Sequence, residues 1–177
     1  ATLRQLLSHT TAGQSGLTFS YRPDRLAPLA AAVAACTDST VRFGVGALFD
    51  RLAMIRSVPG ADVVRLTAPA EGFAASTLQR YGDTVRDLAT PYAVDSRGRA
   101  TVSTYPASAL TPDSGLISTV RDLEQFDLAL KKGVLMQPEM LTLAWTPPLD
   151  RNGEPLPHGL GWFVQSYNRE RVVWQFG

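Results

Sequence analysis

The sequence predicts a mixed α+β fold in which helices come first and an antiparallel sheet begins near the end. Three observations support this expectation. Apolar residues recur at helical spacing in several stretches before residue 91, a short hairpin pattern follows, and longer paired strand-like runs appear only after residue 158. A chain of 177 residues, 45% of them hydrophobic, is also long enough to build an apolar core.

Residues 1–91 are expected to form a mostly helical region. Thr2 and Gln5 fit a capping box, because their side chains can satisfy free amide groups in the first turn of a short helix. A loop rich in threonine, glycine and serine then leads to Tyr21. Apolar spacing predicts three further helices, after Pro23, from about Thr40 and over 77–88.

Two expectations in this region concern burial. The stretch 57–71 has no periodic pattern, and Pro59, Gly60 and Pro69 interrupt it, so we expect it to lie on the surface. Cys36 is the only cysteine, which excludes an internal disulfide. Its alanine-rich helical setting favours a small buried side chain.

Residues 92–157 are expected to form a small hairpin and two helices. The turn-forming residues 95–98 separate two short runs of strand-forming residues. Thr119 can cap the next helix, which Gly133 ends, and Pro138 can begin a shorter helix.

Residues 158–177 are expected to begin the antiparallel sheet. Strand-like runs over 160–167 and 171–176 flank the turn residues 168–170. A two-stranded ribbon alone is marginally stable in water. We therefore expect remaining segments of the same protein, or another copy, against the strand Arg171–Phe176.

Composition argues against several classes of function. The net charge is +1, with 17 basic and 16 acidic residues spread along the chain, which argues against a nucleic-acid partner. No apolar run approaches the ~20 residues needed to span a membrane.

The two histidines, His9 and His158, lack the spacing of metal ligands, so structural or surface roles are favoured and no metal is expected.

The residues alone offer few catalytic candidates. Neither a G-x-S-x-G elbow nor a glycine-rich phosphate loop occurs. Tyr21 stands out because it follows a glycine- and serine-containing loop and shortly precedes Pro23, a setting that can hold a tyrosine at the mouth of a cleft. On spacing alone, however, an ordinary half-buried tyrosine is the favoured interpretation.

Five ordered segments span nearly the whole chain and carry recognisable motifs. They are TLRQLLSHTTAG at 2–13, FSYRP at 19–23, FDRLAM at 49–54, SGLISTVRDLEQF at 114–126 and GLGW at 159–162. Together they resemble serine hydrolases of the β-lactamase and penicillin-binding-protein superfamily, including class C β-lactamases, D-alanyl-D-alanine carboxypeptidases and related esterases. The resemblance implies part of a β-lactamase/transpeptidase-like fold, namely a mostly helical subdomain and the first strands of the returning sheet.

The resemblance also implies a mechanism. In that superfamily the nucleophile is the serine of an S-x-x-K motif, which lies upstream of the segment that 2–13 resembles. This chain contains no S-x-x-K; Ser39, Ser96 and Ser118 have arginine at that spacing, and arginine cannot act as a base. We therefore expect the chain to begin after the nucleophile. The implied activity is hydrolysis of a small ester or amide through an acyl-enzyme, without a metal or organic cofactor.

Two motifs of the family can be matched to residues of this chain. Tyr21 matches the tyrosine that moves the proton to the leaving group, whereas Pro23 replaces the asparagine of Y-x-N. Gln175, Phe176 and Gly177 align with the K-T-G or H-x-G motif that binds substrate, with a neutral glutamine in place of the cation. These departures favour an esterase-like enzyme over a true β-lactamase.

An alternative interpretation is a non-catalytic family member that serves as a binding or scaffolding module. The two altered motifs favour it, and an S-x-x-K upstream of Ala1 would argue against it. The resemblance implies a bacterial protein, and the compartment stays open between the periplasm, the medium and the cytoplasm.

Overall fold

The computed structural model describes residues 1–68 and 70–176 and contains two compact units. Unit 1 joins Ala1–Leu29 to Leu128–Gly177, and unit 2 is Ala30–Asp127. Helices and small antiparallel strand pairs make up both units, so the α+β expectation is confirmed. The predicted division of the chain into the consecutive regions 1–91, 92–157 and 158–177 stays a prediction.

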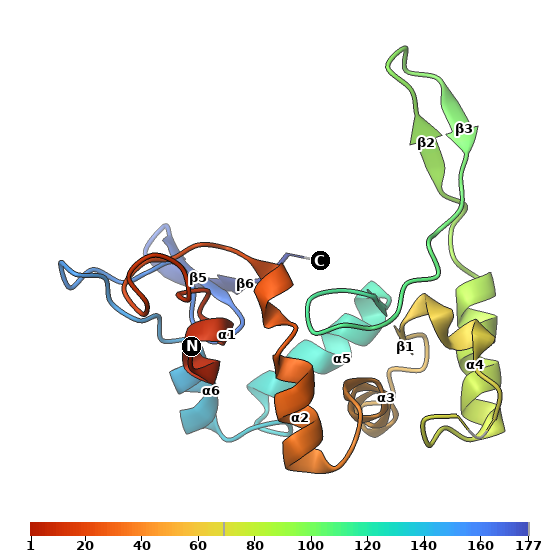
Figure 1. The fold of residues 1–177 in the computed structure, drawn as a ribbon, viewed down its shortest axis with the longest axis horizontal. Helices are drawn as coiled ribbons and strands as arrows, with labels where there is room; N and C mark the ends of the chain where they lie inside the picture. The colour runs from red at the N-terminus through yellow and green to blue at the C-terminus, as the bar shows by residue number, and fades with distance from the viewer. Residues whose placement is uncertain (69, 177) are drawn as a thin grey trace. The chain divides into compact units, whose positions relative to one another are not determined.

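Unit 1 brings the two ends of the sequence together (Figure 1). Its elements are α1 (Leu3–Leu7), the 3-10 helix η1 (Pro23–Leu26), α6 (Pro138–Ala144), β5 (Phe163–Tyr167) and β6 (Glu170–Trp174). The Gly161 amide donates to the Leu7 carbonyl at 2.9 Å, and the Leu160 amide donates to the Ala144 carbonyl at 2.7 Å. A Cβ on Gly159 would collide with the Ala144 carbonyl. This close approach accounts for the first glycine of the GLGW segment.

The ends of α1 and of the β5–β6 hairpin follow local rules. The Thr2 amide donates to Gln5 Oε1 at 2.9 Å and the Gln5 amide donates to Thr2 Oγ1 at 3.2 Å, so the predicted capping box is confirmed. Asn168 and Arg169 both have positive φ, 52° and 66°, as a two-residue turn between twisted strands requires. Among the described residues, β6 pairs only with β5.

Unit 2 combines helices with the two antiparallel strand pairs β1–β4 and β2–β3. Its elements are α3 (Val41–Arg51), β1 (Val58–Pro59), the 3-10 helix η2 (Ala61–Arg65), α4 (Ala75–Arg86), β2 (Tyr92–Val94), β3 (Ala100–Val102) and β4 (Leu116–Ile117). The helices α2 (Leu29–Thr37) and α5 (Val120–Lys131) each include residues of both units. The core of unit 2 consists of buried Val58, Val63, Phe73 and Tyr81.

The expectation that 57–71 lies on the surface is wrong for its first half, whereas Val64, Arg65, Thr67, Ala68 and Glu71 are exposed. Ser57, Val58, Pro59 and Val63 are buried, because β1 pairs with β4 and η2 packs on α4. The pairing partner of Val58 is Ile117, which is remote in sequence. Pro59 and Gly60 therefore lie in a buried bend of the backbone, and their presence does not indicate that the segment is exposed. Pro69 lies outside the described residues.

Cys36 is exposed, so its expected burial is also wrong. The alanine-rich helix α2 has no clear division into apolar and polar faces, and spacing alone could not tell which side chains would be covered.

The expected β2–β3 hairpin is confirmed, with Asp95 accepting from the Arg97 and Arg99 amides in its turn.

The segment 114–126, the longest of the motif-like segments, has a structural role. The Asp122 amide donates to Thr119 Oγ1, which confirms the predicted cap of α5. The buried Asp122 carboxylate accepts from the Arg56 amide at 2.9 Å and from the Ser57 hydroxyl at 2.7 Å. Asp122 thereby ties the start of α5 to the chain just before β1.

Two glycines of α3 provide a matched test of packing. A Cβ on Gly46 would lie 2.6 Å from a Phe73 ring carbon, whereas a Cβ on Gly44 would meet nothing within 4 Å. We expect Gly46→Ala to destabilise the protein by about 2 kcal/mol through overpacking, and Gly44→Ala to stabilise it by about 0.5 kcal/mol through helix propensity. Urea unfolding of both variants measures this, and equal effects would contradict the described packing.

No helix in the described part of the chain is long and apolar enough to cross a membrane.

Candidate active site

The loop that carries Tyr21 is held from both sides by His9. The Ser20 amide donates to the His9 carbonyl at 2.9 Å. The Arg22 amide donates to Nδ1 of the His9 ring at 3.2 Å. Pro23 then begins η1, where its fixed φ suits the first helical position. Tyr21 therefore lies between two anchored amides.

His9 itself lies in a buried polar turn after α1. Its φ is 53°, a left-handed conformation that is uncommon outside glycine, although histidine, asparagine and aspartate adopt it more often than other residues do. On either side, the hydroxyls of Ser8 and Thr10 lie 3.0 Å apart, and Ser8 Oγ donates to the Arg4 carbonyl at 2.8 Å. Ser8, His9 and Thr10 are all at most 3% exposed. The turn is therefore rigidly packed.

An aromatic cluster surrounds this turn within unit 1. The Tyr21 ring centroid lies 4.7 Å from His9, 5.3 Å from Phe163 and 5.4 Å from Phe176. The His158 ring meets His9 edge-on at 4.7 Å. The members of the aromatic cluster are His9, Phe19, Tyr21, His158, Phe163, Trp174 and Phe176.

Burial determines the charge state of both histidines. Burial, and then the neighbouring His158, lower the pKa of His9 from 6.5 to about 4, against an opposing effect of Asp24. Burial also lowers the pKa of His158, although the Gly159 and Leu7 carbonyls oppose the shift. The His158 Nδ1 lies 2.9 Å from the Gly159 carbonyl, and its buried Nε2 has no hydrogen-bond partner among the described residues. Both rings are therefore neutral at pH 7.

The Tyr21 side chain is half-buried, and its hydroxyl has no hydrogen-bond partner in the described part of the chain. The ring packs on its neighbours through its faces and edges, as the contacts with His9 and Phe163 describe. No hydrogen bond in the described part of the chain therefore occupies the phenol oxygen. This arrangement suits transfer of a proton by a positioned side chain.

The predicted substrate-binding residues lie at the end of β6. Gln175 is exposed, and its side-chain nitrogen donates to the Gly161 carbonyl at 3.1 Å while its oxygen accepts from the Phe176 amide at 2.9 Å. Phe176 is 60% exposed and its ring contacts Tyr21. Gly177 lies outside the described residues. The structure therefore brings Tyr21 and the Gln175–Phe176 segment together.

The two histidines meet, yet they form no metal site with other side chains. Within residues 1–68 and 70–176, no group of three or more histidine, cysteine, aspartate or glutamate side chains could hold a metal ion. Neither spacing nor composition predicted that His9 and His158 would touch. The one available signal was that His158 directly precedes the GLGW segment, which the resemblance had already marked.

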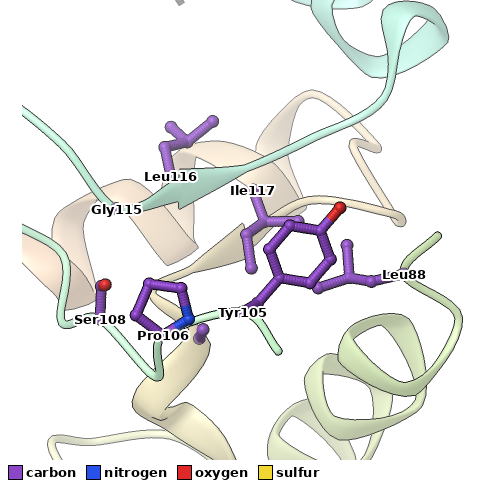
Figure 2. A pocket seen from close by; sticks show the side chains of 8 residues that line it. Leu88, Tyr105, Pro106, Ser108, Gly115, Leu116 and Ile117 are labelled. Atoms are coloured by element: carbon purple, nitrogen blue, oxygen red, sulfur yellow. The ribbon is translucent and has the colours of Figure 1, made fainter. Parts of the chain in front are cut away.

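A separate cavity lies in unit 2 (Figure 2). Its volume is about 250 Å³, and Leu88, Tyr105, Pro106, Leu116 and Ile117 give it a largely apolar lining. Figure 2 shows the side chains of Leu88, Tyr105 and Ile117 gathered at one end of it. No residue that the sequence marked as catalytic or substrate-binding lines this cavity.

No protein-family model matches the sequence, and no curated protein matches it. The fold, however, has clear counterparts among solved structures. The chain has the fold of penicillin-binding-protein homologues and D-amino acid amidases, so the expected β-lactamase/transpeptidase-like fold is confirmed.

Three of these structures are informative. The octameric penicillin-binding protein homologue from Pyrococcus abyssi has a TM-score of 0.68 and 18% identity, over 92% of this chain and 34% of its own. A D-stereospecific amidohydrolase from Streptomyces sp. has a TM-score of 0.66 and 15% identity, over 98% of this chain and 60% of its own. The D-amino acid amidase from Ochrobactrum anthropi in complex with L-phenylalanine amide has a TM-score of 0.62 and 14% identity, over 98% of this chain and 56% of its own. This chain therefore spans between about a third and three fifths of the length of these structures.

Proposed function

We propose that this chain is part of a serine hydrolase that cleaves a small ester or amide through an acyl-enzyme. The observation that carries the proposal is the meeting of Tyr21 with the Gln175–Phe176 segment, since the Tyr21 and Phe176 rings lie 5.4 Å apart. These two segments resemble the motifs that line opposite sides of the active site in the β-lactamase and penicillin-binding-protein superfamily. Two named neighbours of the same fold, an amidohydrolase and an amidase, support hydrolysis of an acyl bond.

In this proposal Tyr21 transfers a proton between the nucleophilic serine and the leaving group. A phenol has an ordinary pKa near ~10, so it serves as a base only when a nearby cation lowers its pKa. The lysine of an S-x-x-K would supply that cation. No described residue is hydrogen-bonded to the Tyr21 hydroxyl, so the hydroxyl can bond to such a partner.

The substrate class follows from the end of β6. Gln175 is neutral, and its amide is already bonded to the backbone of Gly161 and Phe176. A substrate carboxylate would find no cation at this position, in contrast to the K-T-G motif. We therefore favour an uncharged ester or amide substrate, with an esterase-like enzyme ahead of a true β-lactamase.

Besides a substrate, we propose a polypeptide partner for the free edge of β6. Among the described residues the free edge of β6 is unpaired, Val172 is 39% exposed and Phe176 is 60% exposed. Sheet edges of this kind bind another strand readily. We propose that a further segment of the same protein, or another copy, covers this edge.

A covalent probe tests the enzyme against the non-catalytic alternative. The coding sequence upstream of Ala1 should contain an S-x-x-K, and the full-length protein should form a fluorophosphonate adduct on that serine, detected by mass spectrometry. The 177-residue chain alone should form no adduct and should not hydrolyse p-nitrophenyl acetate or nitrocefin above background, because it lacks the nucleophile. An adduct on a serine of this chain, or no S-x-x-K upstream, would overturn the proposal.

A further inference from the structure

The backbone on both sides of Tyr21 is fixed by one residue. The amide before it, that of Ser20, donates to the His9 carbonyl at 2.9 Å. The amide after it, that of Arg22, donates to the His9 ring at 3.2 Å. The same ring packs against the phenol, with 4.7 Å between centroids and 47° between planes. His9 therefore constrains both the backbone and the ring of Tyr21.

We infer that His9 is a positioning residue for Tyr21, and that the bond from the Arg22 amide to His9 Nδ1 sets the orientation in which the phenol transfers its proton. This inference rests on the proposed function. Correct placement matters because proton transfer requires a heavy-atom separation of about 2.6–3.2 Å between the partners. Small displacements of a catalytic group are costly for the rate.

The chemistry of the imidazole suits this role. Nδ1 can accept the Arg22 amide only when it carries no proton, so the ring must be the neutral tautomer with its proton on Nε2. The ring is 3% exposed, which keeps water from competing for that amide. The His158 ring lies edge-on to His9 at 4.7 Å, so positive charges on both rings would repel each other. The packing therefore favours the acceptor form.

A matched pair of variants separates this role from simple packing. Asparagine tolerates the left-handed backbone of residue 9 and places its side-chain oxygen near the position of Nδ1, so His9→Asn keeps an acceptor. Leucine fills space but accepts nothing, so His9→Leu removes the bond. If His9→Leu fails to fold, His9→Gln replaces it, because its longer side chain places the amide away from the Nδ1 position.

Two measurements on the full-length protein test the inference. In His9→Leu, the Arg22 amide should exchange faster with solvent and its proton resonance should shift upfield, whereas His9→Asn should retain most of its protection. Turnover of p-nitrophenyl acetate should fall by ~10-fold or more in His9→Leu, mainly in kcat, and by much less in His9→Asn.

A double-mutant cycle tests whether His9 affects turnover through Tyr21. His9→Leu should cost less than about twofold when added to Tyr21→Phe, because a residue that acts through Tyr21 has nothing left to position. A fully additive loss, or an unchanged Arg22 amide in His9→Leu, would overturn the inference. If Tyr21→Phe alone leaves turnover unchanged, the proposed catalytic role of Tyr21 fails, while the Arg22 amide still reports independently on the His9 bond.

Discussion

Under the mechanism that we propose, replacing Tyr21 by phenylalanine in the full-length protein should lower turnover by about a hundredfold or more, as expected when a positioned proton-transfer group is lost. The fold should survive, because the Tyr21 hydroxyl has no hydrogen-bond partner among the described residues and the ring contacts with His9, Phe163 and Phe176 are kept. Steady-state hydrolysis of p-nitrophenyl acetate gives the effect on kcat. Circular dichroism and urea unfolding check the fold.

Tyr167→Phe is the matched control for that experiment. Tyr167 is on β5, in the same unit, and is 71% exposed. The same loss of one hydroxyl there should leave turnover unchanged. Equal turnover in Tyr21→Phe and in the unaltered protein would remove Tyr21 from the mechanism and return it to the interpretation of an ordinary half-buried tyrosine.

Lowering the pH from about 6.5 to about 4 should cost the protein on the order of 3 kcal/mol of stability through His9 alone. Burial and then His158 lower the pKa of His9 from 6.5 to about 4, so between these values the unfolded chain binds a proton that the folded chain does not. The contribution is complete above pH 6.5 and is lost as the pH falls to about 4. Each unit of pKa difference corresponds to about 1.4 kcal/mol.

The charged and titratable groups around His9 have opposing effects on its pKa. His158 lowers the pKa of His9, Asp24 raises it, and Arg22 is engaged with Asp24 in an exposed ion pair at 2.8 Å. Unfolding in urea at several pH values, for the protein and for His9→Asn, isolates the part that His9 contributes. The variant should show a shallower loss of stability between pH 6.5 and 4. Identical pH dependence in both proteins would contradict a buried neutral imidazole, as would an NMR titration of His9 with an ordinary midpoint.

Local chemistry determined much of the secondary structure. The capping box of Thr2 and Gln5, the cap at Thr119, and the turn at Asn168 and Arg169 depend on groups within about four residues of each other. Such short-range features can be recognised from the chain alone. The ordered motifs around Tyr21 and in 114–126 likewise predicted the fold that the solved structures share.

Only the tertiary structure decided which of these segments are buried and which side chains meet. Val58 pairs with Ile117, and this contact buries a stretch whose proline and glycine content predicted exposure. His9 and His158 come from opposite ends of the chain, yet their rings lie 4.7 Å apart beside Tyr21. The physical reason is that burial and side-chain contact depend on pairings between distant segments, whereas propensity and capping act over a few neighbouring residues. The sequence by itself therefore determined the helices, turns and the candidate Tyr21, and the packing of unit 1 decided that a neutral histidine anchors it.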